Sequence, residues 1–256
     1  MKLIRFVKDG KEKIGILECT TINEISIPMI QALNSEDLSN FQKKSYKLTQ
    51  VQIKPPVIPS KIICIGLNYK DHAEELNMEI PEEPIIFMKP PTSVIAHYEK
   101  IIYPEKVTQL DYEAEMAVVI SNKAHHVKDD DANNYIGGFT VLNDVTARDL
   151  QRKDIQWTRA KSFNTFCPLG PCIETEMDHS NQKISLKLNH QLKQNSNTKN
   201  MIFSVERLIE FISHIMTLMP GDIIATGTPP GVGPMNRDDV VQAEVEDIGI
   251  LKNRVI

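Results

Sequence analysis

Short apolar runs bounded by turn residues dominate the hydrophobic pattern of the chain, and this pattern predicts many strands. The apolar runs 3–7 and 14–17 flank the turn signal Asp9-Gly10, which predicts a hairpin over residues 1–20. Further strands are predicted at residues 61–66, 85–88, 116–120, 138–142, 184–188 and 223–226, and residues 240–256 predict a strand, a turn and a second strand.

Only one stretch has the spacing of a long amphipathic helix. It starts at Ser204, a residue type that caps helices, and Pro220-Gly221 is expected to end it. Its apolar stripe consists of Leu208, Ile209, Ile212, Ile215 and Met216. A shorter helical stretch is predicted at about residues 69–76. Because helices do not alternate with strands, we expect an α+β fold rather than a doubly wound one.

Proline residues divide the chain into two predicted parts. Residues 24–50 are polar and are expected to be helical or irregular, and Pro55-Pro56 and Pro59 then interrupt the chain. We therefore predict a small N-terminal α/β domain at residues 1–55 and a main, strand-rich domain at residues 56–256. The 256 residues are enough for such an arrangement.

Composition and charge exclude several classes of partner. The net charge of −5 gives no general attraction to nucleic acid or to anionic lipid. Charges interrupt the first ten residues too early for a signal peptide, and no apolar stretch approaches the roughly 20 residues that cross a bilayer. The four scattered cysteines indicate reduced thiols. We therefore expect a cytoplasmic protein with neither nucleic-acid nor membrane partners.

The segment Asp111-Tyr112-Glu113-Ala114-Glu115 places acidic residues at alternate positions immediately before an apolar run. In a strand these carboxylates share one face, at about 6–7 Å between neighbouring Cα atoms. Carboxylates this close repel one another, and a hard cation such as Mg²⁺, Mn²⁺ or Ca²⁺ compensates for the repulsion. A solvated edge strand gives the same alternation, and Glu244 and Glu246 flank Val245 in the same way. The segment alone therefore leaves both interpretations open.

Asp144 follows the apolar strand predicted at residues 138–142, and a helix-like segment begins shortly after it. An aspartate in this position is by default the N-cap of the helix. A strand end is also a place from which a third carboxylate can reach a metal held by the neighbouring strand. Three carboxylates together with water would form an open site of oxygen ligands.

His72 and Glu75 are three residues apart on the short predicted helix, which places both on one face. A carboxylate bound to an imidazole fixes its tautomer and raises its basicity, so the pair could activate water. An exposed pair on a polar helix is the ordinary alternative. Lys89 and Lys161 are surface lysines by default, but beside a carboxylate cluster they would offset its charge. The loop 226–233 lacks the pattern of a phosphate loop, although its glycines let backbone amides approach an anion.

In this order the motifs resemble the fumarylacetoacetate hydrolase family. The resemblance covers about residues 60–256. Its matching segments, in order, are Gly66-Leu67-Asn68-Tyr69 with His72 and Glu75, Phe87-Met88-Lys89-Pro90, Asp111-Tyr112-Glu113-Ala114-Glu115, Asn143-Asp144-Val145-Thr146-Ala147-Arg148-Asp149, Ala160-Lys161-Ser162-Phe163 and Gly221-Asp222-Ile223-Ile224-Ala225-Thr226-Gly227-Thr228-Pro229. It implies a mixed β-sheet roll, a homodimer, and a Mg²⁺ or Mn²⁺ ion held by Glu113, Glu115 and Asp144. The catalytic residues that it implies are His72, Glu75 and Lys161, and the implied substrate pocket includes Lys89, Arg148, Gln151 and Thr228.

The same resemblance implies a small-molecule 2-oxo acid as substrate and a metal-stabilised enolate during the reaction. The first expectation is a metal-dependent hydrolase that cleaves a carbon–carbon bond in acylpyruvate-type 2,4-dicarbonyl acids. The alternative is an isomerase or decarboxylase of unsaturated 2-oxo diacids in aromatic catabolism, such as a 2-hydroxyhepta-2,4-diene-1,7-dioate isomerase or an oxaloacetate decarboxylase. A protein that binds 2-oxo acids without catalysis is the third hypothesis.

Overall fold

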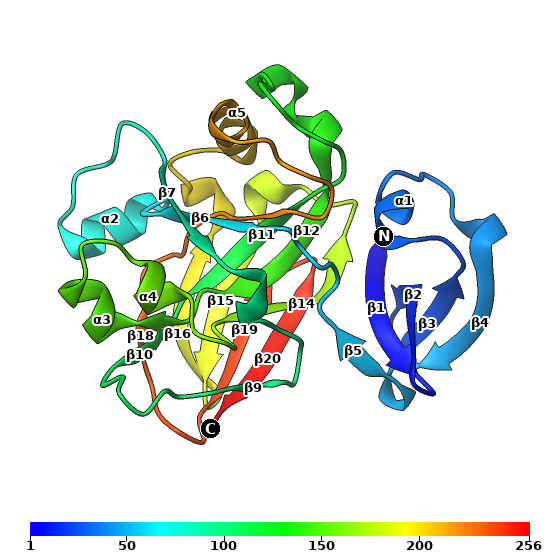
Figure 1. Cartoon of the computed structure of the whole chain (residues 1–256), viewed down its shortest axis with the longest axis horizontal. Helices are drawn as coiled ribbons and strands as arrows, with labels where there is room; N and C mark the ends of the chain where they lie inside the picture. Colours follow the sequence, from blue (N-terminus) through cyan, green and yellow to red (C-terminus); the bar gives the residue numbers. More distant parts are fainter.

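A mixed twelve-stranded sheet runs through the molecule, which a computed structural model describes over all 256 residues (Figure 1). Along the main path the strands lie in the order β4 (Gln42–Lys47), β3 (Thr21–Ile25), β2 (Lys11–Glu18), β1 (Lys2–Lys8), β14 (Cys167–Glu174), β12 (Ile136–Asn143), β11 (Ala114–Ile120), β17 (Ile223–Ala225), β6 (Ile62–Gly66) and β7 (Ile85–Lys89). Off this path, β5 (Gln52–Lys54) pairs with β1, and β8 (Val94–Ile95) pairs with β14.

Two smaller sheets complete the strand-rich α+β fold, which confirms the predicted fold class. The five-stranded sheet has the order β16 (Gln191–Asn197), β15 (Lys183–Leu188), β19 (Val240–Val245), β20 (Gly249–Val255) and β9 (Lys100–Ile101). The three-stranded sheet has the order β13 (Thr146–Ala147), β10 (Leu110–Tyr112) and β18 (Gly233–Met235). The helices are α1 (Met29–Leu33), α2 (Lys70–Leu76), α3 (Arg148–Lys153), α4 (Thr158–Lys161) and α5 (Val205–Ile215).

Strand β11 lies at the centre of the core, and all seven of its residues are buried. Met116 and Val118 belong to a large apolar cluster that also contains inward side chains of the five-stranded sheet. Ala117 and Val119 belong to a second cluster on the opposite face. Both faces are therefore apolar along most of the strand, and the acidic residues at its start are carried into the interior.

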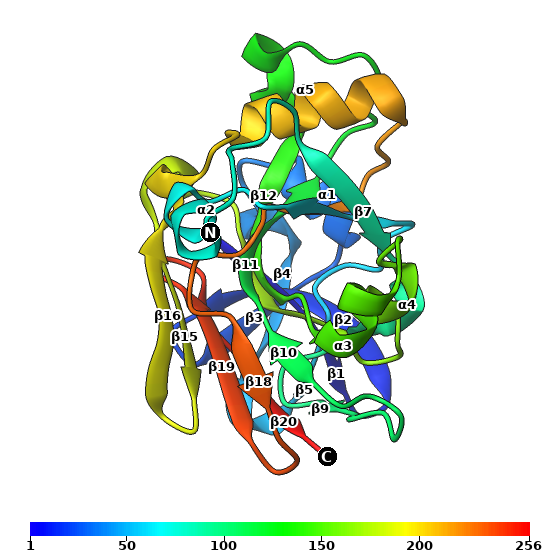
Figure 2. The same cartoon turned by 90° about the vertical axis from the view of Figure 1, so that its left-hand side faces the viewer.

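The long helix begins where its cap predicts but ends earlier than expected. The Ser204 hydroxyl accepts a hydrogen bond from the Arg207 N–H at 3.2 Å. The helix ends at Ile215, not at Pro220-Gly221, because Leu218 pairs in extended conformation with Ala124 through hydrogen bonds of 2.9 and 3.0 Å. Both views place α5 at the same end of the molecule, where it covers the core (Figure 1, Figure 2). No helix of the protein has the length and apolar character needed to span a membrane.

The N-terminal strands continue the large sheet. The predicted hairpin is confirmed as β1 and β2, whose ends meet at the pair Lys8 and Lys11. The expectation for residues 24–50 is partly wrong, because helix is limited there to α1 and two 3-10 turns, at Ser39–Phe41 and Leu48–Gln50, and β4 pairs with β3. Strand β1 also pairs with β14, at Lys2 with Glu174 and Leu3 with Ile173. The division at residue 55 stays a prediction.

Candidate active site

Three carboxylates converge inside the molecule near the start of β11. The ligand atoms of Glu113, Glu115 and Asp144 all lie within 4.8 Å of one another, and the three residues are buried. Pairing of β11 with β12 explains this convergence, because it sets Ala114 opposite Asn143, so that Asp144 lies beside Glu113. The Asp144 N–H donates to the Glu113 carbonyl at 2.8 Å. The sequence expectation that a strand end supplies a third carboxylate therefore agrees with this geometry.

The acidic segment itself is not one continuous strand, and this expectation is wrong. Strand β10 ends at Tyr112 and β11 begins at Ala114, so that Glu113 lies at a break between two sheets. The Asn143 side-chain carbonyl accepts the Glu113 N–H at 3.0 Å and stabilises this break. Asp111 consequently lies outside the cluster and accepts a hydrogen bond from Arg148 Nε at 2.8 Å.

The N-cap interpretation of Asp144 is also wrong. Helix α3 begins at Arg148, and its N-cap is Ala147. Asp144 is fully buried and forms ion pairs with Lys89 and, at 2.6 Å, with Lys161. Both lysines are buried as well, so neither has the surface position that is the default for lysine. The charges pair inside the protein because unpaired buried charges are costly.

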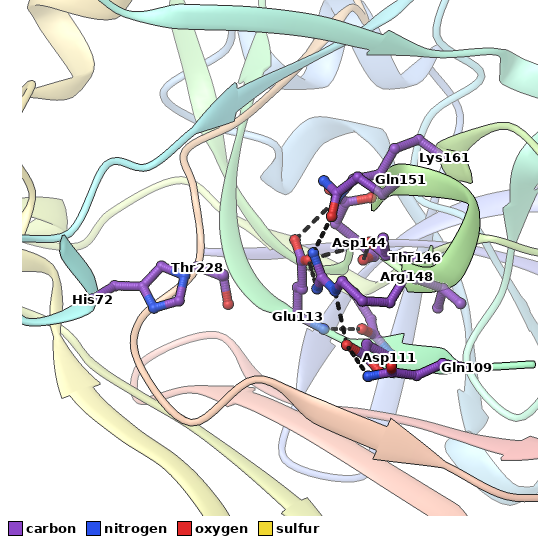
Figure 3. Close-up of polar contacts among 12 residues, drawn as sticks. His72, Gln109, Asp111, Glu113, Asp144, Thr146, Arg148, Gln151, Lys161 and Thr228 are labelled. Carbon is purple, nitrogen blue, oxygen red and sulfur yellow. Dashed lines mark hydrogen bonds and ion pairs between the residues drawn. The ribbon is translucent and has the colours of Figure 1, made fainter. Parts of the chain in front are cut away.

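Lys161 and Arg148 neutralise Glu113. Lys161 Nζ lies 3.0 Å from Glu113 Oε2, and Arg148 Nη2 pairs with Oε1 (Figure 3). Burial alone would raise the pKa of Glu113, but the two cations outweigh burial and lower this pKa to about 2. Burial lowers the pKa of Lys161, whereas Asp144 and Glu113 raise it, and the resulting pKa is above the ordinary lysine value. Glu113 and Lys161 are therefore both charged at neutral pH.

Glu115 has no cationic partner. Its carboxylate accepts one hydrogen bond, from the Gly227 N–H at 2.9 Å. Burial, followed by the charges of Asp144 and Glu113, raises the pKa of Glu115 well above its ordinary value. An all-oxygen donor set with an uncompensated buried carboxylate fits a hard divalent cation. The residues present therefore suit Mg²⁺ or Mn²⁺, and Glu113, Glu115 and Asp144 would hold it.

His72 and Glu75 form the predicted pair on α2. His72 Nδ1 lies 2.9 Å from Glu75 Oε2, and the carboxylate also accepts the Gly231 N–H at 3.0 Å. An ionised carboxylate only accepts, so Nδ1 carries the proton and Nε2 remains the basic nitrogen. Figure 3 shows His72 pointing from its helix toward Thr228 and the carboxylates.

A cavity of 370 Å³ brings most of the predicted residues together. From the predicted set it is lined by His72, Glu113, Glu115, Arg148, Gln151, Lys161 and Thr228. Lys89 and Asp144 lie behind this lining, and Glu75 reaches it through His72. A larger hollow of 800 Å³ beside β7 contains none of the three carboxylates, so we place the active site in the smaller cavity.

Several residues of the site have no signal in the sequence. The buried amide of Gln194 donates to the Thr228 hydroxyl at 2.9 Å and accepts the Ala114 N–H at 2.9 Å. The Thr228 hydroxyl donates in turn to the Ala114 carbonyl. Arg152 and Trp157 line the cavity, and Gln109 accepts a hydrogen bond from Arg152 at 3.0 Å. These three residues and Gln194 have no signal in the sequence, and Gln194 is 80 residues away from Ala114. Thr228 is consequently held in one orientation, with its only hydroxyl proton already donated.

The fold and the site together define a strand-rich α+β protein with a buried carboxylate cluster and a His–Glu pair around one cavity. A family model described as the C-terminal part of fumarylacetoacetate (FAA) hydrolase matches residues 61–256. The chain belongs to the fumarylacetoacetate hydrolase family, which includes hydrolases, isomerases and tautomerases.

Three similar proteins illustrate this range of reactions. A mitochondrial oxaloacetate tautomerase of Rattus norvegicus is 46% identical over 220 residues, which cover 81% of this chain and 70% of that protein. The crystal structure of a 2-hydroxyhepta-2,4-diene-1,7-dioate isomerase from Mycobacterium marinum has a TM-score of 0.91 and 35% identity, and covers 100% of this chain and 98% of its own.

The third similar protein is a maleylpyruvate hydrolase from Sphingobium sp. SYK-6, solved in complex with manganese (II) ion and pyruvate. It has a TM-score of 0.85 and 26% identity, and covers 100% of this chain and 99% of its own. The family membership and the buried carboxylate cluster agree with the sequence expectations. The roles of the individual site residues, the homodimer and the cytoplasmic location stay predictions.

Proposed function

We propose that the protein is a divalent-metal-dependent enzyme that acts on 2-oxo acids by forming an enolate, and that keto–enol tautomerisation is its reaction. One observation carries this proposal: a His–Glu pair, a buried lysine and a carboxylate cluster meet at a single cavity. When bound by Glu113, Glu115 and Asp144, the metal would supply Lewis acidity toward the 2-oxo group. The preferred substrate is an acid with an acidic hydrogen next to that group.

The side chains and backbone of the cavity supply the other three roles that the reaction needs: a base, a positive charge and a carboxylate-binding group. His72 Nε2 removes a proton from the carbon next to the 2-oxo group and returns it to the enolate oxygen, which gives the enol. Glu75 holds the imidazole ring in the required tautomer. Lys161 stabilises the negative charge that develops on the substrate oxygen. The Thr228 N–H has no hydrogen-bond partner within the chain, and it is available to the substrate carboxylate.

Tautomerisation is preferred over hydrolysis for two reasons. It needs one base and no second reactant, which the single His–Glu pair satisfies. Similar proteins with more than 40% identity are also named oxaloacetate tautomerases. Hydrolysis of 2,4-dicarbonyl acids of the acylpyruvate type is the second candidate, because the same pair could activate water. The two candidates differ in their products.

The test is a panel of 2-oxo acids assayed with Mg²⁺ and with Mn²⁺, in which enol–keto conversion and carbon–carbon cleavage are followed separately. We expect oxaloacetate tautomerisation that EDTA abolishes, and we expect His72→Ala to lower kcat about 10²–10⁴-fold. Glu113→Ala should lose both metal binding and activity, whereas His214→Ala, an exposed histidine outside the cavity, should behave as the wild type.

Three other outcomes would change the proposal. Cleavage of acylpyruvates without tautomerisation would favour the hydrolase. Full activity of His72→Ala would exclude His72 as the base. Metal-dependent oxalate binding without turnover of any acid in the panel would favour a binding protein.

A further inference from the structure

The cations of the cavity are paired with carboxylates, with one exception. Arg148 pairs with Asp111 and Glu113, and Lys161 pairs with Glu113 and Asp144. Arg152 also lines the cavity, but it forms no ion pair. The positive charge of Arg152 is therefore the one charge of the lining that remains available to an anion from solution.

The guanidinium of Arg152 is held in place without being neutralised. Its Nη1 donates to Gln109 Oε1 at 3.0 Å, and Gln109 Nε2 donates to the Asp111 carboxylate at 3.0 Å. Gln109 thus uses one of the five N–H donors of the guanidinium, and the others remain free for a carboxylate. Arg152 lies four residues after Arg148 on α3, so both arginines project from the same face of the helix.

An exposed arginine is ordinarily solvated and contributes little. Lys153, the next residue of α3, has that ordinary position, since it is exposed and does not line the cavity. The wall contributed by α2, the following loop and β7 is apolar at Leu76, Met78, Ile85 and Phe87. These four side chains can contact a carbon chain but offer no partner for a second charge.

We propose that Arg152 binds the distal carboxylate of the substrate and thereby makes 2-oxo dicarboxylic acids the preferred substrate class. The inference rests on the proposed function for the position of the reacting end, which lies at the carboxylate cluster. The distal carboxylate then extends along α3, where Arg152 can bind it through two parallel N–H groups. Arg148 is less suited to this role, because Asp111 and Glu113 already offset its charge and Gln151 accepts a further N–H group.

Two substrates, one with and one without the distal negative charge, test the inference. We compare oxaloacetate with its 4-methyl ester in the wild type, Arg152→Gln, Arg152→Lys and the control Lys153→Gln, which removes the same net charge. Arg152→Gln should raise KM for oxaloacetate about tenfold and leave kcat for oxaloacetate unchanged within twofold. The KM for the ester should also stay within twofold of the wild-type value. Arg152→Lys should recover part of the loss, and Lys153→Gln should equal the wild type.

Equilibrium binding, measured separately from turnover, distinguishes this inference from the proposed function. Calorimetry of the Mn²⁺-loaded protein compares 2-oxoglutarate with 2-oxopentanoate, which has a methyl group in place of the distal carboxylate. The wild type should bind the diacid about tenfold more tightly, and Arg152→Gln should bind the two equally. If the wild type keeps this preference but turns over no 2-oxo acid, the proposed function fails and the role of Arg152 stands.

Equal binding of the two ligands by the wild type would overturn the inference. The same holds if Arg152→Gln weakens diacid and monoacid alike, or if Lys153→Gln has the same effect as Arg152→Gln.

Discussion

Glu115 differs from its neighbours in the carboxylate cluster because no cation of the chain neutralises it. Glu113 and Asp144 each bind buried or half-buried cations, whereas Glu115 accepts a single backbone hydrogen bond. Burial and the two neighbouring charges raise the pKa of Glu115. The charged form is therefore unfavourable in the metal-free protein, and a bound cation relieves this cost.

Glu115→Gln should stabilise the metal-free protein and weaken metal binding. A carboxyl whose pKa is raised in the folded state stabilises the folded protein fully at pH values below its unfolded-state pKa of about 4.5. This contribution is lost as the pH rises through the folded-state pKa. In EDTA, the melting temperature of the variant should therefore exceed that of the wild type increasingly as pH rises above about 4.5. The shift should be several degrees, since 1–2 kcal/mol moves a protein of this size by about 2–8 °C.

Saturating Mg²⁺ provides the control for this comparison. It should raise the melting temperature of the wild type more than that of Glu115→Gln, because the folded wild type offers the ion three carboxylates and the folded variant only two. Equal melting temperatures of the two proteins in EDTA at neutral pH would contradict the absence of charge compensation at Glu115.

At the residue scale, sequence reasoning succeeds where the backbone pattern determines the position. The strand end identifies the third carboxylate, because pairing of β11 with β12 requires Asp144 to lie beside Glu113. An acidic alternation at Glu244 and Glu246 leaves both side chains partly or fully exposed, so the pattern alone does not identify a metal site. Arg152 and Gln194 could not be predicted, since their roles depend on tertiary contacts and not on a local motif.

At the scale of elements, Gln194 connects β16 to the start of β11 and to the loop after β17. Its side chain makes three buried hydrogen bonds, to Ala114, Thr228 and Pro229. Gln194→Leu should lower the free energy of unfolding by about 2–4 kcal/mol, because it leaves buried polar groups without partners. It should also raise KM, because Thr228 loses its fixed orientation. Denaturant unfolding and steady-state kinetics measure both effects.

Gln191→Leu is the matched control for this prediction. Gln191 lies on the same strand, is exposed, and accepts only from Lys193. It should change stability by no more than about 0.5 kcal/mol. Gln194→Leu with wild-type stability and KM would show that the amide has no positioning role.

His97 lies in the segment between β8 and β9, bonds to β20, and should make the free energy of unfolding depend on pH. Its Nδ1 accepts the Lys252 N–H at 3.0 Å, and burial, helped by the Lys252 charge, lowers the pKa of His97 to about 4. The unfolded chain binds the proton more readily, so stability is complete above about pH 6.5 and declines as pH falls toward 4. The loss should reach at most about 3 kcal/mol.

Denaturant unfolding at several pH values between 4 and 7 measures this decline. His97→Gln keeps an acceptor for the Lys252 N–H but does not titrate, so its stability should fall less over the same range. Identical pH profiles of variant and wild type would assign the decline to other groups.

Element boundaries were harder to predict than element types. The apolar runs predicted ten of the twenty strands, but not the long strands β14 and β16. The early end of α5 depends on the pairing of Leu218 with Ala124, which lies far away in sequence. The N-terminal strands β3 and β4 are polar on exposed positions, and their pairing into a sheet is not apparent from local periodicity. Tertiary pairing decided both cases.

At the scale of the whole molecule, β1 lies inside the large sheet, between β2 and β14. Leu3 and Phe6 of this strand are fully buried in the two apolar clusters. Deletion of residues 1–55 should therefore expose the edge of β14 and leave cavities in both clusters. We expect residues 56–256 alone to aggregate or to unfold at much lower temperature, as followed by circular dichroism and size-exclusion chromatography.

Addition of residues 1–55 as a separate polypeptide is the control, and it should restore soluble folded material if the deletion acts through lost packing. A deletion variant as stable as the full chain would instead show that residues 56–256 form an independent domain, as the proline residues at 55–59 suggest.

The loop 226–233 limits how this active site can diversify. The Gly227 N–H donates a hydrogen bond to Glu115, and the Gly231 N–H donates one to Glu75. The two glycines have positive φ values, of 96° at Gly227 and 91° at Gly231. A Cβ at Gly227 would lie 2.8 Å from Asn68 Cβ, and one at Gly231 would lie 2.2 Å from the Lys193 carbonyl oxygen. Laboratory evolution toward new acids should therefore tolerate few changes in this loop. Libraries directed at the exposed face of α3 and the segment after α2 are the better starting point.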